Sequence, residues 1–478
     1  MRICFEAIYQ DAVVYVNGKR VGEHPGKGYT PFSFDITEYL RFEGSKVASL
    51  SGYKVTSPQN LKTLKPQNQI EVHTSNAYTD KSLPYKRSFD WSNDGGIYRS
   101  VRLHISGKQT LRYVHATPSA DGTVRFDIRL WNEKDNRLSG RLIVKNRQTG
   151  RTEYDATVSL KKKKDEQQFS TTITIDNPQL WHFDQPNLYD FTFQIFNDAN
   201  PLNDQTTNPL NDQTTNPLND QTANLLNDQT TNPLNDQTTN LLNDQISDHF
   251  GFRDFRIEGH SFVLNGERVR LPGIEDMPGS TPVYGMAEPR DFIEKTVRTM
   301  KDLNTCITRF HYVPDRRMVD MMDEMGILCQ LELSWWQQPS KQLSPELRQV
   351  ARESLEEMIE AFYNHPSIYG WGISNEVNGN HEEVKLLADD VRRLDSTRIV
   401  DVLCNKIWRE LANDPSLVLD LPTWNEYTGT WHGKNREELP ARFERIHQAI
   451  GNRPLFITEN GLCETSRSEE RFSRNAET

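Results

Sequence analysis

The sequence predicts a multidomain β plus α/β protein, in which two β-sandwich domains precede a TIM (β/α)8-type barrel. Three observations lead to this prediction. Residues 1–256 carry short strands of period-two alternation, separated by turn residues. From residue 257 onward, continuous apolar strands alternate with amphipathic helices, which is typical of a buried parallel sheet. Two of these strands end in glutamate, at Glu376 and Glu459, where a barrel carries its reactive side chains.

Length and composition limit the classes of protein to consider. The 478 residues are enough for about three domains. The net charge is −11 and no basic stripe with interleaved aromatic residues is present, so nucleic acid is not an expected partner. No apolar run reaches the roughly 20 residues of a membrane span. The 5 cysteines are odd in number and form no CxxC pair, which argues against a disulfide framework.

Residues 1–107 are predicted to form the first sandwich. Their apolar residues alternate in period two, and Gly, Pro and Asn separate the strands. The segment DAVVYV-NG-KRVGEH indicates a β-hairpin, because Asn17 and Gly18 suit the two left-handed positions of a type I′ turn.

Residues 108–256 are predicted to form a second sandwich, interrupted by a repetitive insert. Its strands are TVRFDIRLW, GRLIVKN, FSTTITI and LYDFTFQIF. Residues 200–247 repeat an eight-residue unit, N-[PL]-L-N-D-Q-[TI]-[TAS]. Its few leucines cannot offset the entropy of ordering the polar positions, so we predict a disordered loop without a function. A calcium-binding β-roll would place glycines beside the aspartates, and the unit has none.

Residues 257–466 are predicted to form the barrel, without its last unit. Seven apolar strands recur about every 30 residues, which is the spacing of a (β/α)8 barrel. They cover residues 269–274, 305–312, 327–333, 367–374, 398–404, 417–424 and 454–458. A doubly wound sheet is the alternative, but no glycine-rich phosphate loop follows the first strand.

Amphipathic helices lie between these strands. Ser344 can cap a helix whose first turn holds Pro345. The apolar stripe of that helix is Leu347, Val350, Ala351, Leu355, Met358, Ile359 and Phe362. A second helix carries Met318, Met321, Met322 and Met325, which we assign to the core, and ends at Gly326.

The two strand-terminal glutamates predict the chemistry. Glu376 and Glu459 are about 80 residues apart, close to three units of about 30, so both should face the same mouth of the barrel. Retaining glycoside hydrolysis requires such a pair of carboxyl groups, about 5–5.5 Å apart. Three alternatives remain at this point: structural ion pairs at the barrel rim, a carbohydrate-binding protein without turnover, and an inverting hydrolase on a similar scaffold.

Several motifs, in the right order along the chain, resemble glycoside hydrolase family 2, which includes β-galactosidases, β-glucuronidases and β-mannosidases. They are VYVNGKRVGEHPGKGYTPFSFDIT, DWSNDGGIYRSVRL, FGFRDFRIEGHSFVLNGERVRLPG, NTCITRFHY, GWGISNE and PLFITENG. The resemblance implies a jelly-roll-like sugar-binding domain, an immunoglobulin-like domain and a catalytic barrel. It covers nearly the whole chain apart from the repeats and the tail.

The resemblance also implies roles for individual residues. Glu376 matches the acid/base, and Glu459 matches the nucleophile. Asn375 matches the asparagine that binds the sugar 2-hydroxyl. Tyr427 matches the tyrosine that steadies the nucleophile, and Arg309 an arginine near it. For Tyr427 and Arg309, core packing and rim ion pairing are the alternatives.

Further residues match the family less closely. Asp90 matches an aspartate that reaches the substrate from the first domain, although it could be an ordinary turn residue. His311 is one residue closer to Arg309 than the family pattern has it, which weakens its assignment to the substrate site. Trp431, like Trp335 and Trp336, could stack on a sugar ring or simply pack.

The resemblance also sets expectations for metal, substrate and assembly. The magnesium-binding galactosidases carry Glu-x-His after the third strand, whereas this chain reads LELSWWQQP, so we predict no catalytic metal and no cofactor. An oligosaccharide or glycoside is the expected substrate, a β-galactoside first and a β-glucuronide second. The Asn-x-Lys pair of the glucuronidases would lie beyond the seventh strand. Homo-oligomerisation and compartment, cytoplasmic or periplasmic, stay open.

Relative to the family pattern, we expect the chain to be truncated at both ends. Further strands would precede FEAIYQDAVVYVNG, and an eighth barrel strand would follow Glu459. We interpret residues 467–478, RSEERFSRNAET, as a non-native tail, because they read as the translation of a common sequencing adapter. The activity of the chain as written is therefore open.

Overall fold

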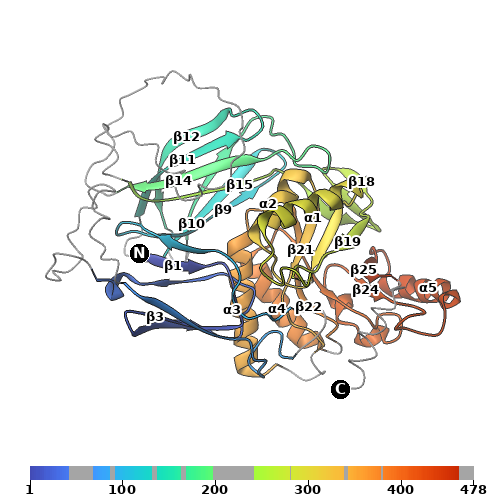
Figure 1. The fold of residues 1–478 in the computed structure, drawn as a ribbon. Coiled ribbons are helices and arrows are strands. Elements are labelled where there is room, and N and C mark those ends of the chain that lie inside the picture. Colours follow the sequence, from blue (N-terminus) through green and yellow to red (C-terminus); the bar gives the residue numbers. More distant parts are fainter. Residues whose placement is uncertain are drawn as a thin grey trace.

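The computed structural model describes residues 1–41, 68–86, 92–131, 137–162, 168–196, 242–279, 281–337, 343–377 and 380–461. Figure 1 shows two β-sandwiches, in blue and in green, beside a yellow-to-red α/β part. Three predictions fall outside the described residues: the role of Asp90, the repeats up to residue 241, and the tail at 467–478. Among the described helices, none has the length and apolar character needed to cross a lipid bilayer.

The first sandwich is built from short antiparallel sheets. One sheet has the order β5-β1-β8, a second has β4-β3-β6, and β2 pairs with β7. Asn17 and Gly18, between β3 and β4, have φ of 53° and 74°, which confirms the predicted left-handed pair of the hairpin. The strands are β1 (Arg2–Phe5), β2 (Ile8–Tyr9), β3 (Asp11–Val16), β4 (Lys19–His24), β5 (Phe32–Asp35), β6 (Ile70–Ser75), β7 (Gly96–Ile97) and β8 (Val101–His104).

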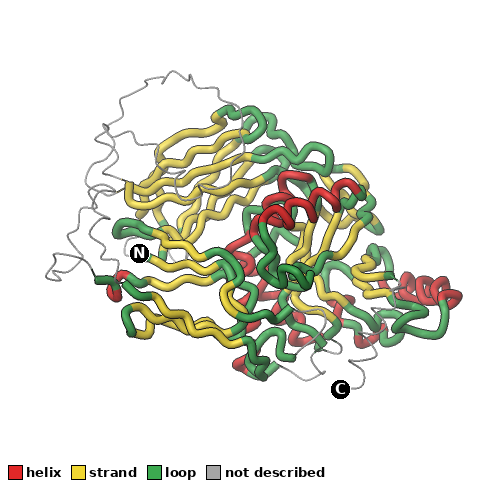
Figure 2. Tube along the Cα trace, viewed as in Figure 1, coloured by secondary structure: helices red, strands yellow, loops and turns green. Residues whose placement is uncertain are grey.

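The second sandwich packs a three-stranded sheet, β13-β10-β9, against a four-stranded sheet, β12-β11-β14-β15. Figure 2 shows these strands in yellow above the first sandwich. Buried and partly exposed residues alternate along β14, so its side chains at odd-numbered positions fill the core between the sheets. The strands are β9 (Leu111–Pro118), β10 (Thr123–Leu130), β11 (Arg137–Asn146), β12 (Thr152–Lys161), β13 (Phe169–Thr174), β14 (Tyr189–Phe196) and β15 (Leu242–Phe250).

The end of the repeat tract corrects one prediction. Residues 242–247 were expected in the disordered insert, yet they form the first part of β15 and pair with β14. The polar side chains of the repeat find partners there. Asn243 donates to the carbonyl of Gln109 (2.6 Å), and the Asp244 carboxylate accepts from the backbone N–H of Leu111 (2.8 Å). A strand neighbour thus supplies the hydrogen bonds that the sequence pattern could not show.

The α/β part contains the seven barrel strands in the predicted order. The first five form one parallel sheet, β19-β20-β21-β22-β23, and β24 pairs in parallel with β25. An antiparallel sheet, β16-β17-β18, leads into them. The strands are β16 (Phe255–Glu258), β17 (Ser261–Leu264), β18 (Glu267–Val269), β19 (Gly273–Glu275), β20 (Ile307–Phe310), β21 (Leu328–Glu332), β22 (Ile368–Asn375), β23 (Ile399–Leu403), β24 (Thr423–Glu426) and β25 (Phe456–Asn460).

The helices of the barrel confirm the predicted caps and stripes. Ser344 accepts from the backbone N–H of Leu347, and every residue of the predicted stripe is buried. Met318, Met321 and Met322 lie in the core, and Gly326 ends its helix with φ 69°. The helices are α1 (Arg290–Asp302), α2 (Arg316–Met325), α3 (Pro345–Phe362), α4 (His381–Leu394) and α5 (Leu439–Ile450).

The sixth barrel strand begins later than predicted. The apolar run 417–424 was expected to be the strand, but β24 starts at Thr423. Asp414 caps a 3₁₀ turn over Pro415–Val418, and Pro422 has no N–H to give to a ladder. The first apolar residues of the run therefore form a turn, and the strand begins later, nearer to the site residues that follow it.

The first sandwich docks on α3 through one buried cluster. The Glu357 carboxylate accepts from the Lys27 ammonium at 2.7 Å and the Thr30 hydroxyl at 2.5 Å, and it lies 3.0 Å from His24 Nε2. Lys27 also binds Glu353 at 2.7 Å. Because Lys27 is buried, its charge is paired across the interface rather than solvated.

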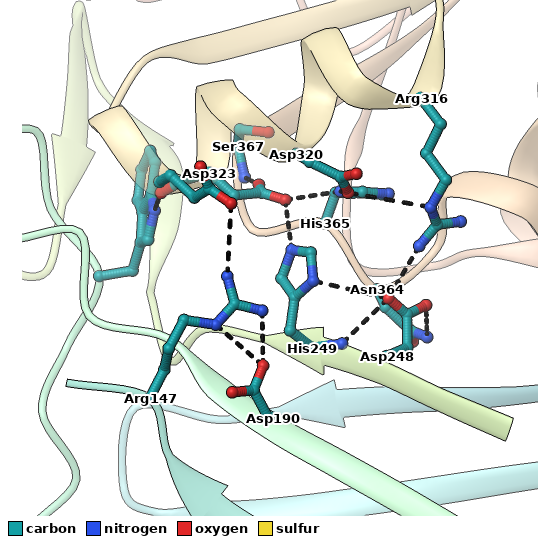
Figure 3. Close-up of polar contacts among 12 residues, drawn as sticks. Arg147, Asp190, Asp248, His249, Arg316, Asp320, Asp323, Asn364, His365 and Ser367 are labelled. Carbon is teal, nitrogen blue, oxygen red and sulfur yellow. Dashed lines mark hydrogen bonds and ion pairs between the residues drawn. The ribbon is translucent and has the colours of Figure 1, made fainter. Parts of the chain in front are cut away.

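The second sandwich docks on α2 through Asp323, which is fully buried (Figure 3). His249 of β15 lies with Nε2 2.7 Å from Asp323 Oδ2. His365, which precedes β22, lies with Nδ1 2.5 Å from the same oxygen. The other oxygen accepts from the backbone N–H of Ser367 at 2.8 Å. One carboxylate therefore joins the sandwich, a barrel helix and the segment that leads to a barrel strand.

Candidate active site

The ends of the parallel strands bring the two predicted glutamates together. Glu376 follows the last residue of β22, and Glu459 lies in β25. Asn425 Nδ2, at the end of β24, is 3.3 Å from Glu376 Oε1 and 2.8 Å from Glu459 Oε1. Contact with one nitrogen keeps the two Oε1 atoms, which are the facing oxygens of the pair, within about 6 Å of each other. Retaining enzymes hold their two carboxyl groups about 5–5.5 Å apart, and inverting enzymes about 6.5–9.5 Å apart.

Glu459 is surrounded by donors. The Tyr427 hydroxyl donates to Glu459 Oε2 at 2.9 Å, and Arg309 Nη1 donates to Oε1. Burial raises the pKa of Tyr427, and the charge of Glu459 raises it further. The hydroxyl therefore keeps its proton at neutral pH and remains a donor to Glu459.

Arg309 is fixed by three carboxylates at the end of β20. Besides Glu459, it binds Glu275 Oε1 through Nη1 at 2.8 Å and Glu332 Oε2 through Nε at 3.0 Å. Burial raises the pKa of Glu332 to about 7, although the charge of Arg309 acts to lower it. Arg309 is thus held in one position by carboxylates at the ends of the neighbouring strands β19 and β21 and by Glu459.

His311 is part of the site despite its unusual spacing from Arg309. Its Nδ1 pairs with Glu275 Oε1 at 2.6 Å, and its Nε2 lies 3.6 Å from Glu459 Oε1. Burial and Arg309 act to lower the pKa of His311, but Glu275 and Glu459 outweigh them and raise it to about 9. The imidazolium adds a positive charge beside Glu459.

Glu376 has a different environment from Glu459. Burial raises its pKa, and the charge of Glu459 raises it further. Gln337, after β21, donates through Nε2 to Glu376 Oε2 at 2.8 Å. The two glutamates therefore differ: burial and a neighbouring carboxylate raise the pKa of Glu376, whereas Glu459 receives hydrogen bonds from Tyr427 and Arg309.

The structure places the remaining predicted residues as follows. Asn375 is 1% exposed, and its Oδ1 accepts from Asn425 at 3.0 Å, so it lies next to both glutamates. Trp431 is 52% exposed in the turn that follows Tyr427. Trp335 and Trp336 are 0% and 8% exposed, so packing explains both rings better than sugar stacking does.

Several residues of the site were not predicted from the sequence. Asn425, Glu275, Glu332 and Gln337 touch the predicted residues directly. The first three share one signal, because each is a polar residue in the last two positions of a barrel strand. Gln337 lies five residues beyond β21, where the pattern gives no such signal.

Among the described residues, two groups of side chains have donor atoms close enough for a metal ion. In the first, Glu275, His311 and Glu459, the Arg309 guanidinium already contacts both carboxylates. A divalent cation would have to displace that guanidinium, so these residues fit a metal poorly. The second group contains Asp320, Asp323, His249 and His365, and direct hydrogen bonds to Asp323 account for both histidines.

Comparisons with known proteins bear on the family and the fold of the chain. Residues 255–462 match the family model "Glycosyl hydrolases family 2, TIM barrel domain", and residues 104–209 match "Glycosyl hydrolases family 2". A β-galactosidase of Thermoanaerobacter pseudethanolicus is 26% identical over 442 residues, which cover 90% of this chain and 49% of the relative. The chain thus spans about half the length of such curated relatives.

Solved structures share the fold at lower identity. A Bacteroides uniformis β-glucuronidase, covalently bound to cyclophellitol-6-carboxylate aziridine, superposes with a TM-score of 0.72 at 23% identity, covering 96% of this chain and 51% of that one. A β-galacturonidase of Eisenbergiella tayi, bound to galacturonate, gives 0.72 at 22% identity, covering 96% and 71%. Together, the two family models match more than half of the sequence, and the fold agrees with them. The chain belongs to glycoside hydrolase family 2.

Proposed function

We propose that this chain carries the catalytic pair of a retaining exo-β-glycosidase that hydrolyses a terminal β-linked sugar. The observation that supports this most is the Asn425 amide, which contacts both carboxyl groups. The resulting limit of about 6 Å between their facing oxygens supports the close pair of a retaining enzyme, in which one carboxylate attacks the sugar directly.

The contacts of the two glutamates support a different role for each. Glu459, which receives hydrogen bonds from Tyr427 and Arg309, attacks the anomeric carbon and forms the ester as the glycosidic C–O bond breaks. Glu376, whose pKa burial and Glu459 raise, gives its proton to the leaving oxygen. In the second step Glu376 takes a proton from water, whose oxygen attacks the same carbon and releases Glu459.

Charge favours a neutral sugar, with a β-galactoside as the first candidate. The cationic side chains that contact Glu459 are Arg309 and His311, and both are already paired with Glu275. A uronate would bring another carboxylate to this acidic cluster. A β-glucuronide or β-galacturonide is the second candidate, supported by the names of the Bacteroides uniformis and Eisenbergiella tayi structures.

The test uses a panel of nitrophenyl β-glycosides with neutral and uronic sugars. We expect hydrolysis of a neutral β-glycoside by the chain, with retention at the anomeric carbon by NMR, and loss of more than about 1,000-fold in rate with Glu459→Ala. Glu267→Gln, at an exposed glutamate of β18, is the matched control and should leave the rate unchanged. An inverted product would exclude the mechanism. Saturable sugar binding without turnover would instead support a carbohydrate-binding protein.

A further inference from the structure

Glu376, one member of the proposed catalytic pair, and the nearby Gln337 both have an unusual backbone conformation. Glu376 has φ 58° and Gln337 has φ 42°, both in the left-handed region that non-glycine residues rarely adopt. Their side chains meet, because Gln337 Nε2 donates to Glu376 Oε2 at 2.8 Å. Strained conformations of this kind persist only where the surrounding structure holds them, and they concentrate at functional sites.

The backbone of Gln337 is held from both sides. Its N–H donates to the carbonyl of Asn375 at 3.1 Å, which ties it to the end of β22. Its carbonyl accepts from the Tyr85 hydroxyl at 3.1 Å, and Tyr85 belongs to the first sandwich. A residue 252 positions away in the sequence therefore contributes to the conformation of the segment beside Glu376.

The amide of Gln337 makes a closer contact with Glu376 than Asn425 does. An amide nitrogen carries two hydrogens, and those of Asn425 have nearer acceptors in Glu459 (2.8 Å) and Asn375 (3.0 Å) than in Glu376 (3.3 Å). An oxygen that accepts an N–H uses a lone pair. The bond from Gln337 to Oε2 therefore favours the acidic proton on Oε1, the oxygen that faces Asn425.

We propose that Gln337, anchored by Tyr85 of the first sandwich, is a positioning residue for the acid/base Glu376. The inference rests on the proposed function for its kinetic consequences, whereas the contact itself can be tested without turnover. Gln337 directs the proton toward Oε1, and it stabilises the ionised form that must accept a proton from water in the second step. The first sandwich thereby acts on the chemistry of the barrel through two hydrogen bonds.

The groups around Glu376 determine how its pKa should respond to the loss of Gln337. Glu459 raises the pKa of Glu376, while Arg309 and the hydrogen bonds from Gln337 and Asn425 act to lower it. Removal of the Gln337 donor leaves the other three in place. The pKa of Glu376 should therefore rise in Gln337→Met, which keeps the length of the side chain but cannot donate.

The experiment measures this pKa directly in the full chain. The carboxyl carbon of Glu376 is assigned in ¹³C-glutamate-labelled protein by its absence in Glu376→Gln and then titrated by NMR. We expect a rise of about half a unit to one unit in Gln337→Met, and a smaller rise in Tyr85→Phe. Gln194→Met, at a half-buried glutamine that bonds Gln245 in the second sandwich, is the matched control and should leave the pKa unchanged. An unchanged pKa in folded Gln337→Met would overturn the proposal.

Kinetic measurements provide a second, independent test of the role of Gln337. With Gln337→Met, kcat/KM, which reports the first step, should fall about 10-fold for phenyl glycosides, whose departure needs acid catalysis. It should fall less than about 2-fold for dinitrophenyl glycosides, whose departure does not. An equal loss on both substrates would indicate a structural role and contradict the proposal. If no variant, including the wild type, hydrolyses any glycoside, the proposed function fails, and the titration still decides the role of Gln337.

Discussion

Replacement of Asp323 by asparagine should destabilise the contact between the second sandwich and the barrel more than replacement of any exposed residue of α2. The Asp323 carboxylate is fully buried and bonds His249, His365 and the backbone of Ser367. Asparagine has nearly the same shape, but it carries no charge, and only one of its two end groups can accept. Both imidazoles contact Oδ2 and the Ser367 N–H contacts Oδ1, so the NH₂ group of asparagine faces either the two imidazoles or the Ser367 N–H. In either orientation at least one buried donor is left without an acceptor.

The magnitude follows from these contacts. Hydrogen bonds to a charged group contribute about 1.5–3 kcal/mol each, and removal of one partner from a buried charged pair costs about 3–5 kcal/mol. We expect Asp323→Asn to lower the free energy of unfolding by about 3–5 kcal/mol. Asp320→Asn, on the same helix, is the matched control. Asp320 lies 3.9 Å from His365 Nδ1 and is 26% exposed, so its loss should cost less than about 1 kcal/mol.

Two measurements at pH 6 check the prediction: urea unfolding monitored by tryptophan fluorescence, and thermal unfolding monitored by calorimetry. Because several domains need not unfold together, the relevant transition is the one that Asp323→Asn shifts. A double-mutant cycle of Asp323→Asn with His249→Gln should give a coupling energy of about 1–3 kcal/mol across the interface. Equal costs for Asp323→Asn and Asp320→Asn, or a coupling energy near zero, would refute the assignment of Asp323 as the joint.

The same contact predicts how stability depends on pH. Burial acts to lower the pKa of His249, but the hydrogen bond and charge of Asp323 outweigh it, and the pKa is raised. Its stabilisation is present below the unfolded value of about 6.5 and is lost as pH rises through the higher folded pKa. The wild type should therefore lose stability above pH 6.5 more steeply than His249→Gln. Parallel curves would contradict this.

Three further predictions concern the site and the other interface. Tyr427→Phe removes a donor to Glu459 and should lower the rate of glycosyl-enzyme formation about 10- to 100-fold in burst kinetics; an unchanged burst rate would argue against that role. Glu357→Gln should destabilise the docking of the first sandwich by about 3 kcal/mol in calorimetry, whereas Glu353→Gln, 43% exposed, should cost less than about 1 kcal/mol; equal costs would contradict the assignment. Because burial raises the pKa of Glu376, the alkaline limb of kcat/KM should lie above the ordinary glutamate value of about 4.3, and it should vanish in Glu376→Gln.

Regular patterns made much of the fold predictable. The strands and helices of the barrel follow from apolar runs and stripes, and Ser344 and Gly326 mark helix ends by their own chemistry. Glu376 and Glu459 could be found because a glutamate at the end of an apolar strand is conspicuous. These signals are local, and local signals survive in a single sequence.

The residues that escaped prediction depend on partners far away in the sequence. Asn425 reaches both glutamates only because β24 lies beside β25 and begins after Pro422. Gln337 acquires its role from Tyr85, in another domain. Residues 242–247 join β15 because β14 and the start of β9 satisfy their polar groups. None of these contacts leaves a periodic trace in the sequence.

The left-handed backbone of Glu376 has a consequence for the stability of the whole chain. A non-glycine residue in this conformation lowers the folding stability by roughly 1–2 kcal/mol. The carboxyl group of Glu376 is also buried near a second carboxylate, which costs further stability. Selection for thermal tolerance alone would replace it with glycine or asparagine, which accept this conformation more readily. Laboratory evolution for heat resistance without a screen for turnover would therefore tend to erase the acid/base first, because stability and activity make opposite demands at this position.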